Sequence, residues 1–167
     1  MIRPLALSMM LAAGASMASA ADLTVVFVNP ENYRDAAYSR AFPSDEDRAE
    51  VLRDVQQHLQ RLADRYLGPG DALSIEVLDI DLAGAFDPLR RGGSEVRILT
   101  DITWPRMELR YTLTHDGQVI ASGRERISDM DYLVMARRSY GSDRFIYERP
   151  MLDNWFTRRI VAAKEHG

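Results

Sequence analysis

Cysteine is absent from the 167 residues of this sequence, and its absence excludes several classes of chemistry. A chain without cysteine forms no disulfide, offers no thiol nucleophile and cannot build a cysteine-containing zinc site. It also lacks the side chain to which a lipid anchor would be attached. We therefore expect the stability of the folded protein to come from its core alone.

Long hydrophobic runs are equally scarce. The apolar segment Leu5–Met17 is shorter than the roughly 20 residues that a helix needs to span a bilayer. Arg3 precedes this segment and Ala18-Ser19-Ala20 follows it, which is the pattern of a secretory signal peptide. We predict that residues 1–20 are a signal peptide. Cleavage after Ala20 would release residues 21–167 into the periplasm, without stable insertion in a membrane.

The sequence also lacks an excess of positive charge. Residues 21–167 contain 20 basic and 25 acidic side chains, which gives a net charge of −5. This balance argues against non-specific binding to nucleic acid or to anionic lipid, so we expect no nucleic-acid partner. A segment of this length can form one domain that buries roughly 70% of its unfolded surface. Since no repeat or linker divides it, we predict a single domain over residues 21–167.

The apolar patterns that are present indicate an α+β fold. Ser44 and Asp47 form a capping box before a long apolar stripe, which predicts a helix that stops at Gly68 and Pro69. A second stripe near the C-terminus predicts another helix, with Trp155 in the core. We expect a two-layer domain in which a mostly antiparallel sheet of about four to five strands carries both helices. The strands are predicted at residues 23–28, 73–84, 96–99, 107–114 and 118–127.

The last two strands read as a hairpin around His115-Asp116-Gly117. A two-residue loop would place Glu108 opposite Glu125. A three-residue loop, with the glycine in a left-handed bulge, places Glu108 opposite Arg124 instead. Like charges that face each other are unfavourable, so we predict the three-residue loop.

Two connecting segments carry local signals of their own. The polar segment before the long helix contains Tyr33, Tyr38 and Phe42, which is too aromatic for a disordered loop. We expect these rings to fold back over the sheet. After the hairpin, Ser128 with Asp131 predicts a capped helical turn.

The run Leu73–Gly84 is apolar on both faces. We therefore expect it inside the sheet, covered above and below for at least part of its length. Strict alternation places Asp79 and Asp81 on the face that Leu73 and Val77 begin. An unpaired buried charge is too unfavourable to persist, so the two carboxylates need solvent, a cation or hydrogen-bond donors.

Three interpretations of Asp79 and Asp81 remain open. They cap backbone N–H groups of a turn, they pair with Arg106 or Arg110 on a neighbouring strand, or they form a metal-binding or acid–base pair. We favour the two structural interpretations, because ion pairs perturb carboxylates as readily as active sites do. Either of these two would lower the pKa of the carboxyl groups.

Other chemical motifs in the sequence are weak. Asp79–Gly84 begins like a calcium loop but lacks an oxygen ligand at its fifth position and a glutamate at its twelfth. Arg90–Gly93 lacks the spacing of a phosphate-binding loop. His58, His115 and His166 have no ligand-type neighbour at helical or strand spacing. We assign no catalytic residue, no metal ligand and no cofactor.

Five short motifs follow one another along the chain. They are Pro30-Glu31-x-Tyr33-x-Asp35, Asp79-x-Asp81-Leu82-Ala83-Gly84, Trp104-Pro105-Arg106-x-Glu108-Leu109-Arg110-Tyr111, Asp129-Met130-x-Tyr132 and Met151-Leu152-x-x-Trp155-Phe156. In this order they resemble a family of exported proteins of gram-negative bacteria that is described as a domain of unknown function. The resemblance covers essentially all of residues 21–167. It implies an exported single-domain protein and brings no activity, ligand or catalytic residue with it.

Two classes of function remain open. We favour a non-catalytic binding or envelope-accessory module whose partner is an envelope protein or an anionic glycan. Its contact surface would be the loops around Tyr33, Tyr38 and Tyr140. The candidate binding residues are Asp79, Asp81, Arg106, Arg110 and Tyr33. The alternative is a metal-dependent hydrolase that uses the two aspartates with a divalent ion.

Overall fold

The computed structural model describes residues 21–39, 41, 43–86, 96–136 and 144–166. Several features named above lie outside these residues: the predicted signal peptide, Phe42, Arg90–Gly93 and Tyr140. Within the described ranges, no helix combines the length and the apolar character needed to cross a bilayer.

The described elements begin with a strand and end with a helix. Their order is β1 (Asp22–Phe27), η1 (Pro30–Asn32), α1 (Asp45–Tyr66), β2 (Asp71–Asp81), β3 (Ala85–Phe86), β4 (Arg97–Ile98), β5 (Arg106–His115), β6 (Gln118–Ser128), α2 (Tyr132–Ala136), η2 (Arg144–Ile146), α3 (Arg149–Phe156), η3 (Thr157–Val161) and α4 (Ala162–His166). The turns η1 and η2 are 3₁₀-helical, whereas η3 is a π-helical turn that continues α3 into α4.

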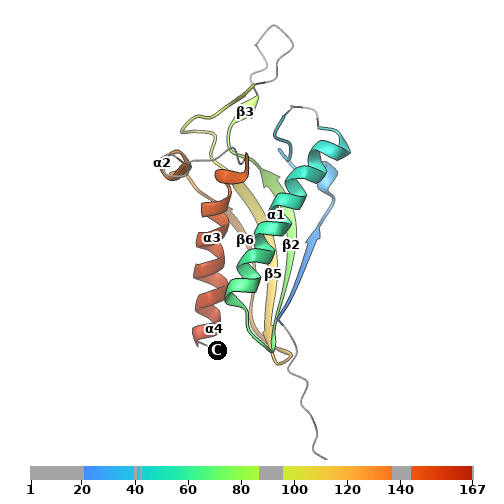
Figure 1. Ribbon diagram of the computed structural model, residues 1–167, viewed down its shortest axis with the longest axis vertical. Coiled ribbons are helices and arrows are strands. Elements are labelled where there is room, and N and C mark those ends of the chain that lie inside the picture. Colours follow the sequence, from blue (N-terminus) through green and yellow to red (C-terminus); the bar gives the residue numbers. More distant parts are fainter. Residues whose placement is uncertain (1–20, 40, 42, 87–95, 137–143, 167) are drawn as a thin grey trace, which may run out of the picture.

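A four-stranded sheet in the order β1-β2-β5-β6 forms one layer, and helices form the other. β1 pairs with β2 in parallel, and α1 supplies the crossover that a parallel pair requires. The remaining pairs are antiparallel. Helices α1 and α3 lie across the same face of this sheet (Figure 1). The predicted α+β fold, with a long helix and a C-terminal helix on a mostly antiparallel sheet, is confirmed.

Both helices form where the sequence predicts them. The Ser44 side chain accepts a hydrogen bond from the Asp47 N–H at 3.2 Å, and the Asp47 carboxylate accepts one from the Ser44 N–H at 2.9 Å. At the other end of the chain, the Trp155 side chain is 4% exposed and its ring meets that of Tyr111 edge-on at 5.6 Å. The predicted core position of Trp155 is confirmed.

The regular alternation predicted for the central strand is wrong, because β2 contains a β-bulge. Val77 pairs with Leu109 and Asp79 pairs with Glu108, so Leu78 is an extra residue without a partner on β5. One extra residue reverses the alternation that follows it. Asp79 and Asp81 therefore lie on the face opposite to Leu73 and Val77, while Ile80 and Leu82 are buried in the core.

Coverage of the central strand on both sides is also not found in the described part of the chain. The face away from the helices carries ion pairs between neighbouring strands. Arg110 contacts Glu76 at 2.5 Å, and Glu108 accepts hydrogen bonds from Arg124 at 2.7 Å and Arg126 at 3.1 Å. These charged side chains make this face of the sheet open and polar. The apolar residues of β2 predicted a covered face, because the sequence alone did not reveal the bulge.

The hairpin also differs from its prediction. His115 pairs with Gln118, so the loop has two residues, and Asp116 (φ 49°) and Gly117 (φ 79°) both adopt the left-handed conformation of a type I′ turn. A bulge at Ile120 then shifts the register by one residue, and Glu108 faces Arg126. The like-charge contact with Glu125 is avoided, as expected, but by a bulge inside the strand.

The end of β6 corrects a further expectation. Ser128 is the last residue of the strand and does not cap the following helix. The Asp129 carboxylate accepts a hydrogen bond from the Asp131 N–H at 3.0 Å instead. Beyond this turn, α2 is described to Ala136. The short strand expected near residue 97 is present as β4 and pairs with β3.

Candidate functional site

The most chemically unusual region lies where β2 ends and α3 begins. Four segments distant in sequence meet there: the loop after β1, the end of β2, strand β4 and the turn before α3. A partly buried arginine from β4 and a buried glutamate before α3 both bond to the backbone that follows β2.

Arg97 holds three of these segments together. Its two terminal nitrogens each donate to an oxygen of the Asp35 carboxylate at 2.8 Å, and one of them also donates to the carbonyls of Ala83 and Gly84. The guanidinium lies 4.4 Å from the centre of the Phe86 ring. Its Nε is buried and has no hydrogen-bond partner in the described part of the chain. The loop after β1 is thereby fastened to the end of β2.

Gly84 permits this close approach. Its φ of +85° lies in the left-handed region, and a Cβ there would come within 2.9 Å of the Arg97 side chain and of the Ile98 carbonyl. The backbone turns sharply at this residue and leads into β3. A side chain at this position would displace the arginine.

Glu148 is the buried acid of the region. The residue is 2% exposed, and its Oε1 accepts a hydrogen bond from the Ala83 N–H at 2.9 Å. Its Oε2 is buried and has no partner among the described residues. Burial raises the pKa of Glu148 to about 7, although the backbone hydrogen bonds and the Arg97 charge oppose this shift. The carboxyl group can therefore gain or lose a proton near neutral pH.

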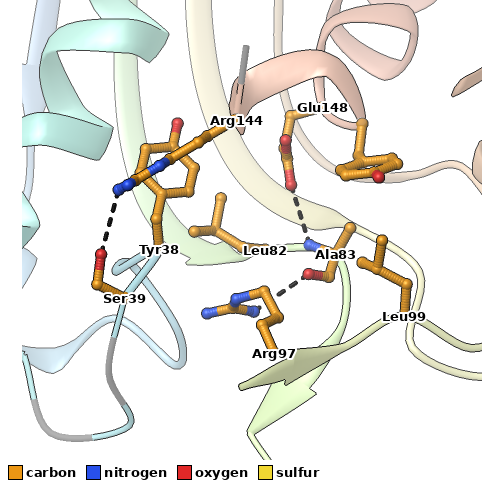
Figure 2. Close-up of a pocket in the computed structure, with 9 residues that line it drawn as sticks. Tyr38, Ser39, Leu82, Ala83, Arg97, Leu99, Arg144 and Glu148 are labelled. Atoms are coloured by element: carbon orange, nitrogen blue, oxygen red, sulfur yellow. Dashed lines mark hydrogen bonds between the residues drawn. The ribbon is translucent and has the colours of Figure 1, made fainter. Parts of the chain in front are cut away.

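Arg97 and Glu148 line a pocket of about 410 Å³. Its other lining residues are Tyr38, Ser39, Leu82, Ala83, Leu99, Arg144 and Tyr147. Figure 2 shows the two arginines and Glu148 around the pocket, with Leu82 and Leu99 on its walls. The size is that of a small-molecule site, and the lining combines apolar walls with a few polar groups.

Two of the polar pocket residues are held in place by neighbours. The Arg144 guanidinium donates to the Ser39 hydroxyl at 3.1 Å and lies 3.7 Å from the Glu50 carboxylate. The Tyr38 hydroxyl donates to Asp54 at 2.9 Å, and burial together with this carboxylate raises the pKa of Tyr38. The tyrosine therefore stays neutral, and Arg144 is the exposed cation at the pocket.

Four of the five binding residues predicted from sequence lie together in a cluster outside the Glu148 pocket. The Asp79 carboxylate accepts the Arg34 backbone N–H at 2.9 Å. Asp81 lies 3.4 Å from the Arg34 guanidinium and 3.5 Å from that of Arg106. The Tyr33 hydroxyl donates to the Val77 carbonyl at 2.6 Å nearby. This cluster combines the backbone-capping and ion-pair interpretations.

Arg110 lies apart from that cluster, since it pairs with Glu76 on the open sheet face. The expected lowering of the Asp81 pKa is wrong. Burial raises the pKa of Asp81, and the charges of Arg106 and Arg34 offset this only in part. Ionised Asp81 is therefore less favourable in the folded protein than in the unfolded chain.

The described histidines bind carboxylates. His58 contacts Asp153 at 2.8 Å, and His115 contacts Asp71 at 2.8 Å. Within the described ranges, no group of three or more acidic, histidine or cysteine side chains is arranged to hold a metal ion. The side chain of His166 lies outside the description.

Sequence reasoning missed Glu148, Arg97 and Arg144. Charged residues are mostly exposed, so the sequence predicts that an acid before Arg149 and Pro150 is a solvent-exposed residue at the start of a helix. Arg97 lies in a two-residue strand, too short for a pattern to show which way its side chain points. The available signal was the Pro150 that follows Glu148, because proline favours the first turn of a helix and fixes where α3 begins.

Comparison with known proteins identifies one family. The model of a family described as "Protein of unknown function (DUF3016)" matches residues 21–158. The chain is also similar to the crystal structure of protein XCC0632 from Xanthomonas campestris, assigned to the family DUF330, with 13% identity and a TM-score of 0.37. That similarity covers 89% of this chain and 88% of the other, and it is too distant to carry any functional argument. None of the curated proteins matches the chain.

Proposed function

Because this chain belongs to the DUF3016 family, whose description states no activity, we propose its function from the chemistry of the pocket around Glu148. The protein acts as an exported, non-catalytic binding module for a small amphipathic molecule with an anionic or hydrogen-bond-accepting head group. The resemblance to a family of unknown function, noted from the five sequence motifs, is confirmed by the match to residues 21–158.

The observation that supports this proposal best is the unused oxygen of Glu148. A carboxyl group that is 2% exposed normally has a partner on each oxygen, because an unsatisfied buried polar group is unfavourable. Here Oε1 is bonded to the Ala83 N–H and Oε2 has no described partner. With its pKa raised to about 7, the protonated acid can donate a hydrogen bond to a ligand.

The charges around the pocket favour an acceptor or an anion over a cation. Arg97 and Arg144 both line it, and Glu148 is neutral when protonated. Leu82 and Leu99 offer apolar surface to the remainder of the ligand. A molecule with an apolar body and a carboxylate or similar head group complements all of these features.

The same pocket favours binding over turnover. An acid–base mechanism would need a second group poised to exchange a proton with the ligand. Tyr38 is bonded to Asp54 through its own proton and has a raised pKa. The hydrolase alternative receives less support, because Asp79 and Asp81 each contact Arg34.

Thermal unfolding in the presence of small probes tests the proposal. Phenylacetate and octanoate are the anionic probes, and phenethylamine is the cationic counterpart. A ligand that binds only the folded protein raises the unfolding midpoint. We expect both anions to raise it and the amine to leave it unchanged. The effect should weaken as pH rises through about 7, because Glu148 then loses the proton that it donates.

Variants assign the effect to the pocket. Glu148→Gln keeps a donor and should bind the anions without this pH dependence, while Arg144→Ala should abolish the shift. Arg53→Ala is the matched control, because Arg53 is also exposed and does not line the pocket. A larger shift with the amine, or equal anion shifts in wild type and Arg144→Ala, would rule out this function.

Export is tested separately. The mass of the intact protein recovered from the periplasm of the native host should correspond to a chain that begins at Ala21. Recovery of a chain that retains residues 1–20, or its absence from that fraction, would contradict the export part of the proposal without affecting the pocket.

A further inference from the structure

A second concave surface lies between α3 and β6, and it shares no lining residue with the Glu148 pocket. It is a groove of about 430 Å³ between β6 and α3. One wall is the four consecutive strand residues 125–128, and the other is a helical stripe of Met151, Asn154, Trp155, Arg158 and Arg159. Figure 1 shows α3 running alongside β6. An edge strand and a helix thus bound an elongated site.

β6 has hydrogen-bonding capacity left along this groove. It is the last strand of the sheet and pairs with β5 alone among the described strands. No described residue forms a backbone hydrogen bond with its outer edge. Such an edge is a template for another extended chain, and recognition domains bind peptides by adding them as a strand beside a helix.

The helical wall offers little apolar surface, because Met151 is 3% exposed and Trp155 is 4% exposed. Met151 and Trp155 form part of the core and also line the groove. The indole N–H of Trp155 is buried and has no hydrogen-bond partner in the described part of the chain. Alternate side chains of an added strand would point towards this wall, because successive side chains of a strand point to opposite faces.

The charge of the groove selects among possible peptides. Arg158 and Arg159 line its helical wall and Glu125 is its single acid, while the guanidinium of Arg126, on the strand side, pairs with Glu108 at 3.1 Å on the sheet face away from the helices. Arg159 pairs with Glu125 at 3.0 Å, whereas Arg158 has no described partner. This local positive charge contrasts with the negative net charge of the chain, −4. An acidic segment is therefore the complementary partner.

We propose that the groove between β6 and α3 binds an extended, acidic peptide segment of another protein, which adds to the sheet as a strand beside β6. Backbone hydrogen bonds to β6 hold the segment in register. Acidic side chains of the segment meet Arg158, the exposed arginine of the helical wall. The chemistry fits an acidic tail or linker of a partner protein.

Selection from a displayed library of random twelve-residue peptides tests this inference on the full chain. We expect the enriched peptides to be acidic and free of proline at their centre. Their affinity should fall as salt is added, because exposed charges are screened. It should also fall at least roughly tenfold in Arg158→Glu, as when charge complementarity across an interface is reversed. Arg53→Glu, which changes another exposed arginine on α1, should bind as wild type does.

Amide hydrogen exchange distinguishes strand addition from loose electrostatic contact. A bound peptide should slow the exchange of β6 amides that do not pair with β5, and a proline placed at its centre should abolish binding. Enrichment of no peptide, enrichment of peptides without acidic residues, or unchanged affinity in Arg158→Glu would overturn the inference. So would a wild-type dimer in sedimentation that Arg158→Glu dissociates, because the occupant would then be a second copy of the chain.

Discussion

Replacing Arg97 by methionine should destabilise the protein more than any exposed arginine substitution. Methionine keeps most of the side-chain volume but removes every hydrogen-bond donor of the guanidinium. The change leaves the Asp35 carboxylate without its two bonds at 2.8 Å, and the carbonyls of Ala83 and Gly84 lose their donor. Removing one partner of a fully buried ion pair costs about 3–5 kcal/mol, because the other charge is left uncompensated. The Arg97 and Asp35 side chains are 13% and 22% exposed, so this range is the upper limit of the expected loss.

This magnitude is large for a domain of this size. A native protein is stable by about 5–15 kcal/mol, so a loss of about 3 kcal/mol would already remove a fifth or more of the total. At roughly 2–4 °C for each kcal/mol, the unfolding midpoint should fall by at most about 20 °C. Urea unfolding followed by circular dichroism, together with thermal scans, measures both quantities.

Two further variants show whether the loss of stability is specific to the Arg97–Asp35 ion pair. Arg110→Met removes an exposed ion pair with Glu76 and should cost less than about 1 kcal/mol. The double variant Arg97→Met with Asp35→Leu should be more stable than the sum of the two single effects predicts. Each single change leaves the remaining charge without its partner, whereas the double change removes both charges. Equal losses of unfolding free energy in Arg97→Met and Arg110→Met, or strict additivity in the double variant, would refute the idea that Arg97 holds the loop after β1 against the end of β2.

Four more substitutions test other parts of the structure. Trp155→Ala should cost about 3–5 kcal/mol in urea unfolding, because it empties a core position. Burial alone would raise the pKa of Asp71, but the Gly68 N–H, Lys164 and His115 hold it below its usual value. Stability gained in this way is present above the unfolded pKa and lost as pH falls through the folded one, so Asp71→Asn should destabilise at neutral pH and much less in acid. Gly84→Ala should lower the unfolding midpoint more than Gly117→Ala does, because both positions have positive φ but a Cβ at Gly117 meets nothing within 4 Å. The raised pKa of Asp81 means that ionisation opposes folding as pH rises above the unfolded value, so Asp81→Asn should keep or increase stability at neutral pH and a clear loss there would contradict this direction.

The features that could be predicted from sequence are those encoded by neighbouring residues. The capping box at Ser44 and the stripes of α1 and α3 depend on side chains three and four positions apart, so each segment carries its own signal. The four-stranded sheet follows from β-rich runs separated by turn residues. The outward position of the Asp79 and Asp81 carboxylates follows from the cost of burying charge, yet their face was assigned wrongly.

The features that could not be predicted depend on contacts between distant segments. The bulge at Ile120 places Glu108 opposite Arg126, Arg110 opposite Arg124 and Gly123 opposite Tyr111. A Cβ at Gly123 would lie 3.2 Å from the Tyr111 ring, so the register suits a glycine there. Local turn chemistry at Asp116-Gly117 is compatible with both loop lengths. Contacts between the paired strands β5 and β6 therefore determine the loop length.

The bulge at Leu78 connects the error in the strand to the missed pocket. In a regular strand, Ile80 and Leu82 would face solvent, and Asp79 and Asp81 would lie beneath the helices. Because the bulge adds one residue, Leu82 becomes a wall of the pocket and the Ala83 N–H reaches Glu148 at 2.9 Å. The irregularity that keeps two acids out of the core therefore also positions the backbone that holds a third acid inside it. A variant that deletes Leu78 should lose both the fold at this end of β2 and the binding of anionic probes, whereas substitutions confined to Asp79 should leave that binding intact.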